Sequence, residues 1–177
     1  TGNWPGKTVV NARGNYSYKD RDFLIVDLPG TYSLFASSTE EAVARDFICF
    51  GNPDAIVVVT DATCLERNLN LVFQVMEITS NVILCINLID EAKKKNIIID
   101  GSAIEKRLGI PVIMCAARSN IGMEELKEAI YNTALNKVHL NYNPITYDED
   151  MENIINEIKQ KVEKNFPNVN SRWFSIR

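Results

Sequence analysis

Short apolar runs alternate along the chain with longer stretches in which apolar residues recur every three or four positions. Four runs are rich in β-branched and other apolar residues: Phe23–Asp27, Ala55–Thr60, Val82–Ile86 and Pro111–Cys115. Runs of this kind are typical of buried strands in parallel sheets. Because helical stretches separate them, the pattern predicts right-handed β-α-β units and an α/β fold. We expect a doubly wound, mostly parallel sheet with flanking helices.

Helix signals lie between and after these runs. A capping box at Ser38–Glu41 predicts a helix over Ala42–Phe50, and a second box at Ser102–Glu105 predicts a helix that ends at Gly109. The other expected helices are Leu65–Ile78, Met123–Leu135 and Met151–Phe166.

The composition changes near the end of the chain. Asn, Tyr and Pro cluster in Lys137–Tyr147, and a charged helical stretch follows. We therefore expect an α/β domain over residues 1–144 and the start of a helical domain over residues 145–177.

Composition excludes several classes of protein. Nineteen Lys and Arg face 23 Asp and Glu, and a net charge of −4 argues against a general nucleic-acid binder. Apolar stretches such as Val82–Ile89 are far shorter than the ~18 residues that a membrane-spanning helix needs. The four cysteines form no C-x-x-C pair and are typical of free thiols in a reducing cytosol. The single histidine, His139, has no partner pattern, which disfavours a Ser-His-Asp or zinc hydrolase.

Polar motifs follow three predicted strands, at the edge where doubly wound sheets bind ligands. The first is Asp27–Gly30. A carboxylate here, beside a phosphate site, can hold Mg²⁺ through water, and Gly30 lets a backbone N–H approach a terminal phosphate. The alternative is a plain turn, since Pro-Gly is common in turns.

The second motif is Asn87–Asp90. A carboxylate at Asp90 can accept both N1–H and the exocyclic amine of guanine, a donor pair that adenine lacks. Asn87 would brace the loop. The alternative is that Asp90 caps a helix.

The third motif, Ala116–Arg118, has small residues that let a backbone N–H reach the guanine O6. The three motifs occur in the order that a guanine-nucleotide site requires.

The segment Gly6-Lys7-Thr8 looks like the end of a phosphate-binding P-loop. However, the spacing from Gly2 to Gly6 is one residue short, no strand precedes Gly2, and Val9–Gly14 has strand character. We therefore expect no P-loop here. The chain also lacks an initiator Met and a signal-like segment, and we expect it to be a fragment.

A wider set of motifs points to one family. They are Gly2–Gly6 with Thr8-Val9, Asp27–Leu34, Glu40-Glu41 with Ala44–Asp46, Asp61–Thr63, Leu65–Leu69, Asn87–Asp90 and Arg172-Trp173. Together, over essentially the whole chain, they resemble the cytoplasmic GTPase domain of the bacterial ferrous iron transport protein B family.

The resemblance implies roles for individual residues. Thr8 is then the switch I threonine that coordinates Mg²⁺ in the GTP state, and Asp27 and Gly30 belong to switch II. Asp27 and Thr8 are the implied metal ligands, and Thr8 and Gly30 the implied catalytic residues. Asn87 and Asp90 read guanine, and Ala116, Ala117 and Arg118 form the last guanine loop.

The resemblance also implies ligands and partners. These are GTP or GDP, Mg²⁺, and K⁺ held in part by backbone carbonyls of the segment from residue 2 to about residue 10. The partner is the membrane-spanning part of the same transporter, at the cytoplasmic face of the bacterial membrane. The residues from about 145 correspond to the start of a helical domain.

The chain departs from the family pattern in ways that affect activity. The family's P-loop lies upstream of Gly2, so the first strand and the phosphate cradle are expected to be missing. Lys7 replaces an apolar residue, and Leu88 stands where many other GTPases have Lys. Thr31 stands where regulatory GTPases carry a water-orienting Gln, so hydrolysis should be slow.

Three other functions are weighed against a GTP-hydrolysing switch domain. A fragment without a P-loop would be unable to bind nucleotide. A ribosome-assembly GTPase would share the guanine motifs, but the acidic balance disfavours it. An ATPase built on Gly6-Lys7-Thr8 would leave Asn87 and Asp90 unexplained.

Overall fold

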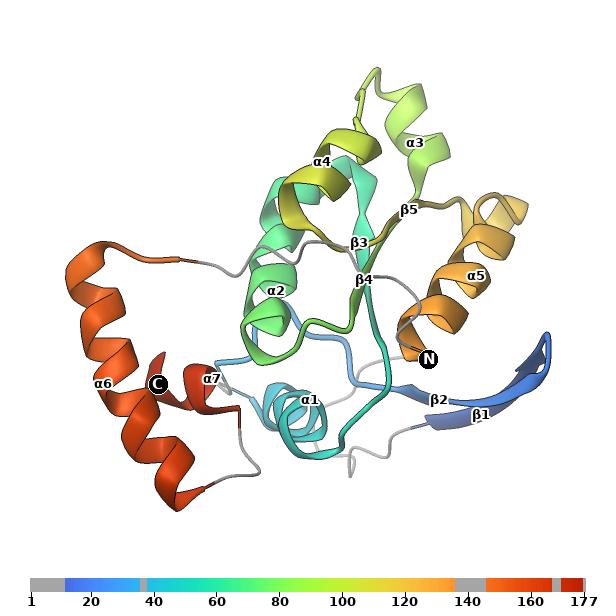
Figure 1. The fold of residues 1–177 in the computed structure, drawn as a ribbon. Helices are drawn as coiled ribbons and strands as arrows, with labels where there is room; N and C mark the ends of the chain where they lie inside the picture. The colour runs from blue at the N-terminus through green and yellow to red at the C-terminus, as the bar shows by residue number, and fades with distance from the viewer. Residues whose placement is uncertain (1–11, 36–37, 136–145, 167–169, 177) are drawn as a thin grey trace.

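Residues 12–35, 38–135, 146–166 and 170–176 are described by the computed structural model (Figure 1). Helices and strands alternate as the sequence predicts. In chain order they are β1 (Ala12–Tyr18), β2 (Arg21–Asp27), α1 (Thr39–Phe50), β3 (Ile56–Asp61), η1 (Ala62–Cys64), α2 (Leu65–Ile78), β4 (Val82–Asn87), α3 (Ile89–Lys94), α4 (Gly101–Leu108), β5 (Val112–Met114), η2 (Ala117–Ser119), α5 (Met123–Ala134), α6 (Glu149–Asn165) and α7 (Ser171–Ile176).

A three-stranded parallel sheet, in the order β3-β4-β5, forms the centre of the fold. Helices α2 and α4 lie on one side of it and α5 on the other (Figure 1). Every residue of Val82–Ile86 in β4 is at most 4% exposed, because strands flank β4 on both edges and helices cover both faces. The expected α/β fold with a parallel sheet and flanking helices is confirmed.

The run Phe23–Asp27 differs from the prediction. It lies in β2, which pairs antiparallel with β1 in a separate two-stranded sheet, with Ala12 opposite Asp27. Leu24 is 59% exposed and Ile25 50% exposed, so the run is not buried in the parallel sheet. The reason is the short turn after Tyr18: a two-residue connection can join only antiparallel strands.

Helix ends match the predicted caps in one case and not in the other. Ser38 caps α1, its Oγ accepting the Glu41 N–H at 3.2 Å. In α4 the cap is Asp100, not Ser102, and the Asp100 carboxylate accepts the Ala103 N–H at 2.9 Å. The Glu105 carboxylate accepts the Val112 N–H at 3.2 Å, so it ties α4 to β5. Gly109, with φ 68°, ends α4 as predicted.

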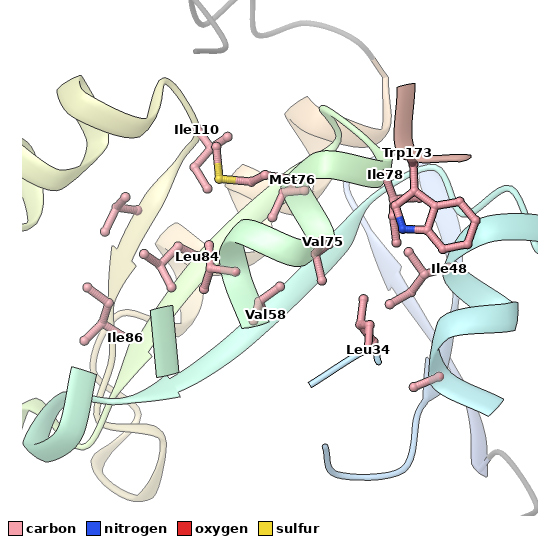
Figure 2. Close-up of a cluster of buried hydrophobic side chains, with 14 of the residues drawn as sticks. Leu34, Ile48, Val58, Val75, Met76, Ile78, Leu84, Ile86, Ile110 and Trp173 are labelled. Carbon is pink, nitrogen blue, oxygen red and sulfur yellow. The ribbon is translucent and has the colours of Figure 1, made fainter. Parts of the chain in front are cut away.

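The C-terminal helices pack on the α/β part. Trp173 of α7 lies beside Ile48 of α1 and Ile78 of α2 in the main core cluster (Figure 2). Arg172 forms a two-pronged ion pair with Glu152 of α6, at 2.7 and 2.8 Å. The guanidinium lowers the pKa of Glu152 to about 2. Among the described residues, no helix is both long enough and apolar enough to span a membrane.

Candidate nucleotide-binding site

The end of β4 forms the first part of the site. Asn87 is the last residue of the strand, and Leu88 adopts the left-handed conformation (φ 63°), which turns the chain directly into α3. Asp90 therefore lies in the first turn of α3, at the carboxyl edge of the parallel sheet. It is not the helix cap, so that alternative is wrong.

The Asp90 side chain holds a buried acceptor atom. Its Oδ1 atom is buried and has no hydrogen-bond partner within the part of the chain that the structure describes. Buried carboxylate oxygens in proteins are almost always paired, since an unpaired one loses its hydration without compensation. A ligand that donates hydrogen bonds at this point, as guanine does with N1–H and its amine, would satisfy the atom.

The loop Ala116–Arg118 lies beside the end of β4, which Asp90 follows, because β5 pairs with β4. The Asn87 Oδ1 accepts the Ala117 N–H at 3.1 Å, and Ala116 is bridged to Ile121 in both directions. The N–H groups of Ala116 and Ala117 are thus occupied. The Arg118 N–H makes no hydrogen bond to any described residue, so it is the donor of this loop that remains for a ligand.

Gly122 closes the same loop, and its position accepts only a glycine. It has φ 75°, and a Cβ at this position would lie 2.2 Å from the Met114 carbonyl oxygen. The loop is therefore held from three sides: by Asn87, by the Ala116–Ile121 bridge and by the tight passage at Gly122. Such fixed backbone donors suit recognition of a planar base.

Asp27 and Gly30 form a second group. Asp27 ends β2 and is exposed, and Gly30 is exposed, with no atom of the described residues within 4 Å of an added Cβ. No hydrogen bond or ion pair between described residues joins this group to Asn87, Asp90 or Ala116–Arg118. The structure thus brings together Asn87, Asp90 and Ala116–Arg118, while Asp27 and Gly30 lie at the end of the other sheet.

Thr8 lies outside the described residues, as do Gly2–Gly6 and Lys7. The implied roles of Thr8 in metal binding and catalysis, and of this segment in K⁺ binding, stay predictions.

Among the described residues of this second group, Asp27 is the carboxylate that could hold Mg²⁺. In the described residues no cluster of three or more His, Cys, Asp or Glu side chains could hold a metal. A single carboxylate fits Mg²⁺ in proteins that bind it mainly through nucleotide phosphates and water. The donor set is thus compatible with a nucleotide-dependent ion.

The sequence reasoning assigned no role to Asp61 and Asn68. Asp61 ends β3 opposite Asn87, and its backbone N–H donates to the Asn68 Oδ1 at 2.9 Å. The Asp61 carboxylate accepts the Thr63 N–H at 2.7 Å, which lowers the pKa of Asp61. The Asp61–Thr63 and Leu65–Leu69 motifs already contained both residues, and the structure shows that these two motifs contact each other.

Comparison with known proteins decides the family. The family model described as ferrous iron transport protein B matches residues 1–130. The chain belongs to the ferrous iron transport protein B family. The Fe(2+) transporter FeoB of Escherichia coli is 35% identical over 180 residues, which cover 99% of this chain and 23% of that protein. The chain thus spans about a quarter of the length of the curated relatives it matches.

Solved structures of family members have the same fold. The cytosolic domain of T. maritima FeoB in a GDP form matches with a TM-score of 0.87 and 37% identity, covering 98% of this chain and 68% of that one. Its GMPPNP form matches with a TM-score of 0.86 at 36% identity and the same coverage. The FeoB G-domain of Methanococcus jannaschii is 45% identical with a TM-score of 0.68, over 70% of this chain and 79% of that one.

Proposed function

We propose that this chain is part of the guanine-nucleotide-binding domain of a ferrous iron transporter, and that the domain hydrolyses GTP once the phosphate cradle is present. The observation that carries the proposal is the buried, unpaired Oδ1 of Asp90 beside the loop that Asn87 holds. Asp90 accepts the guanine N1–H and amine, and the Arg118 N–H donates to O6. The GDP and GMPPNP forms of the T. maritima relative support this choice of ligand.

Base selectivity tests the proposal. In the full-length protein, Asp90→Asn should weaken GDP binding by about a hundredfold and relax discrimination against xanthine nucleotides, because an amide suits the altered edge of xanthine. Competition of GDP, XDP and ADP against labelled GDP measures both effects. Asp54→Asn, an exposed carboxylate elsewhere, is the matched control. An unchanged order of preference in the Asp90 variant contradicts the assignment.

The phosphate half of the site uses Thr8, Asp27 and Gly30. Asp27 and Thr8 would hold Mg²⁺ together with the phosphates, and the bound ion would supply positive charge beside the transferred phosphoryl group. The Gly30 N–H binds the terminal phosphate; an alanine there would meet no atom in the part of the chain that the structure describes, which supports room for this approach. K⁺ held by the segment before residue 11 adds to the same neutralisation.

Hydrolysis should be slow, because the Thr31 hydroxyl is engaged within its own loop. It accepts the Ser33 N–H at 3.1 Å and donates to the Ser33 carbonyl at 2.5 Å. In the full-length protein, Thr31→Ala should change the phosphate-release rate little, and Thr8→Ala should lower it more. A larger loss in the Thr31 variant reverses these roles.

The phosphate cradle is proposed to come from a further strand and its loop, which would lie in space between β2 and β3 and are not part of the chain segment that links them. Each of these strands has one unpaired edge within the described residues, and apolar side chains are exposed on both: Leu24, Ile25 and the 61%-exposed Val59. A further strand would cover both edges. A purified chain of residues 1–177 should therefore bind labelled GDP weakly and show no GTPase activity. Micromolar affinity would sink the alternative that it is incompetent for nucleotide binding.

The domain organisation completes the proposal. Residues 1–144 form the GTPase domain, and residues 145–177 begin a helical domain that links it to the membrane-spanning part. The domain lies at the cytoplasmic face of the membrane. The packing of Trp173 among Ile48 and Ile78 supports a fixed attachment between the two parts.

A further inference from the structure

Helix α2 contacts the loop after Gly30 at two separate points. The Arg67 guanidinium lies over the Tyr32 ring, 4.7 Å from its centroid. Two turns further along the helix, the Gln74 Oε1 accepts the Leu34 N–H at 2.6 Å and the Ser33 hydroxyl at 3.4 Å. Both α2 residues thus engage a loop more than thirty positions earlier in the sequence, and guanine recognition requires neither of them.

These contacts matter because the loop is otherwise held lightly. Leu34 is 2% exposed and enters the same cluster as Ile48 and Val75 (Figure 2), but Tyr32 is 70% exposed and Phe35 62% exposed. An open groove of about 660 Å³ lies between the loop and α2. One buried leucine fixes a single point of the loop. The Arg67 and Gln74 contacts add two further points at which the loop is held to α2.

The loop can pass its orientation on to Gly30. Thr31 and Ser33 are joined by the two hydrogen bonds of the Thr31 hydroxyl, and the Ser33 Oγ accepts the Phe35 N–H at 3.1 Å. These bonds make the segment from Thr31 to Phe35 one stiff turn. A displacement at Tyr32 or Leu34 would thus move the backbone that continues directly into Gly30.

Helix α2 is itself tied to the base-recognition edge. Asn68, next to Arg67, accepts the Asp61 N–H, and Asp61 pairs with Asn87 across β3 and β4. Neighbouring residues of one helix thus hold the loop after β2 and the strand end beside the proposed guanine site. Helix α2 can therefore fix the position of the phosphate half of the site relative to the base half.

We infer that Arg67 and Gln74 are positioning residues, which hold the Thr31–Phe35 loop on α2 and so place the Gly30 N–H for the terminal phosphate of GTP. The inference rests on the proposed function. Because GDP lacks that phosphate, the two residues act on the affinity for GTP and leave the affinity for GDP unchanged.

The test compares both nucleotides in the full-length protein. Gln74→Leu removes the acceptor and Tyr32→Leu removes the ring. Each should weaken binding of a non-hydrolysable GTP analogue by about two- to tenfold, in line with the loss of the short Leu34–Gln74 hydrogen bond and its longer Ser33 partner, or of one cation–π contact. GDP affinity should stay within twofold of wild type. Tyr32→Phe, which keeps the ring, should bind both nucleotides as wild type does, and Glu66→Gln, an exposed position on the same helix outside the groove, is the control.

A second measurement does not depend on nucleotide. Hydrogen exchange at the Leu34 amide should speed up in Gln74→Leu and stay unchanged in Glu66→Gln. Equal losses of GDP and GTP-analogue affinity, or an unchanged ratio of the two, would overturn the inference while leaving the proposed function intact. Failure of wild type to bind either nucleotide would instead overturn the proposed function.

Discussion

Strands β4 and β2 carry similar apolar runs but lie in different surroundings. Val82–Ile86 in β4 is buried throughout, whereas Leu24 and Ile25 in β2 are half exposed or more. β4 has a strand on each side and helices over both faces; β2 has one strand partner among the described residues. An apolar run thus predicts that a strand forms, and the neighbours decide how far it is buried.

The hairpin is fastened to α5 by ring contacts with Tyr131 and by a few polar contacts, whereas the parallel sheet is buried by packing on both faces. Tyr18 donates its hydroxyl to Glu128 of α5 at 3.0 Å, and Lys19 pairs with the same carboxylate at 2.5 Å. Tyr131 donates to Asp20 at 2.7 Å. These bonds fasten the turn of the hairpin, at the end opposite Asp27.

The two halves of the proposed site differ in the same way, because one follows the parallel sheet and the other follows the hairpin. Asn87, Asp90 and Ala116–Arg118 rest on β4 and β5, and their loop is closed by hydrogen bonds to neighbouring strands. Asp27 and Gly30 follow a hairpin fastened at its far end. Recognition of a base requires groups in fixed positions. Binding and release of a terminal phosphate is instead suited to groups that can move.

A matched pair of leucine truncations should give the largest effect. Leu84→Ala in β4 should lower the free energy of unfolding by about 2–5 kcal/mol, because Leu84 is 0% exposed and leaves a cavity. Leu24→Ala in β2 should change it by less than about 0.5 kcal/mol. Urea denaturation measures both. Similar losses in the two variants would mean that the hairpin is packed as tightly as the sheet.

A pair of glycine substitutions separates the two halves of the site. Gly122→Ala should destabilise the chain by about 1–3 kcal/mol, because of its positive φ and the clash with the Met114 carbonyl. Gly30→Ala meets no atom of residues 12–35, 38–135, 146–166 and 170–176 and should leave stability unchanged, while weakening binding of a GTP analogue to the full-length protein. Thermal unfolding and nucleotide titration check the pair; a destabilised Gly30 variant would refute the contrast.

The sequence predicted local features better than distant contacts. Helix α2, the Ser38 cap and the Gly109 end follow from short patterns, and all are confirmed. The order of motifs placed Asn87 and Asp90 at a strand end, but not the unpaired Oδ1 of Asp90, which depends on burial. The contacts of Gln74 with Leu34 and of Arg67 with Tyr32 join positions some 35 to 40 residues apart, and no local spacing encodes them.

The smallest effect expected is a response of the hairpin to acid. Lys19, and after it Tyr18, lower the pKa of Glu128 below its ordinary value of 4.5. A lowered pKa means that the contact stabilises the fold fully above about pH 4.5, and that the stabilisation is lost as the pH falls through the lowered value. Acid should therefore loosen the hairpin from α5 before it affects β3, β4 and β5.

Hydrogen exchange of the amides of β1 and β2, followed from pH 6 downwards and corrected for the intrinsic pH dependence of exchange, measures this loosening. The amides of β4 serve as the internal reference. Glu128→Gln should remove the pH dependence and leave the hairpin amides equally exposed to exchange at every pH, since an amide does not titrate in this range. The effect should be small, because Lys19 and Glu128 are both more than 40% exposed and water screens the pair. Loss of protection in β4 at the same pH as in the hairpin would show that the two regions unfold as one unit.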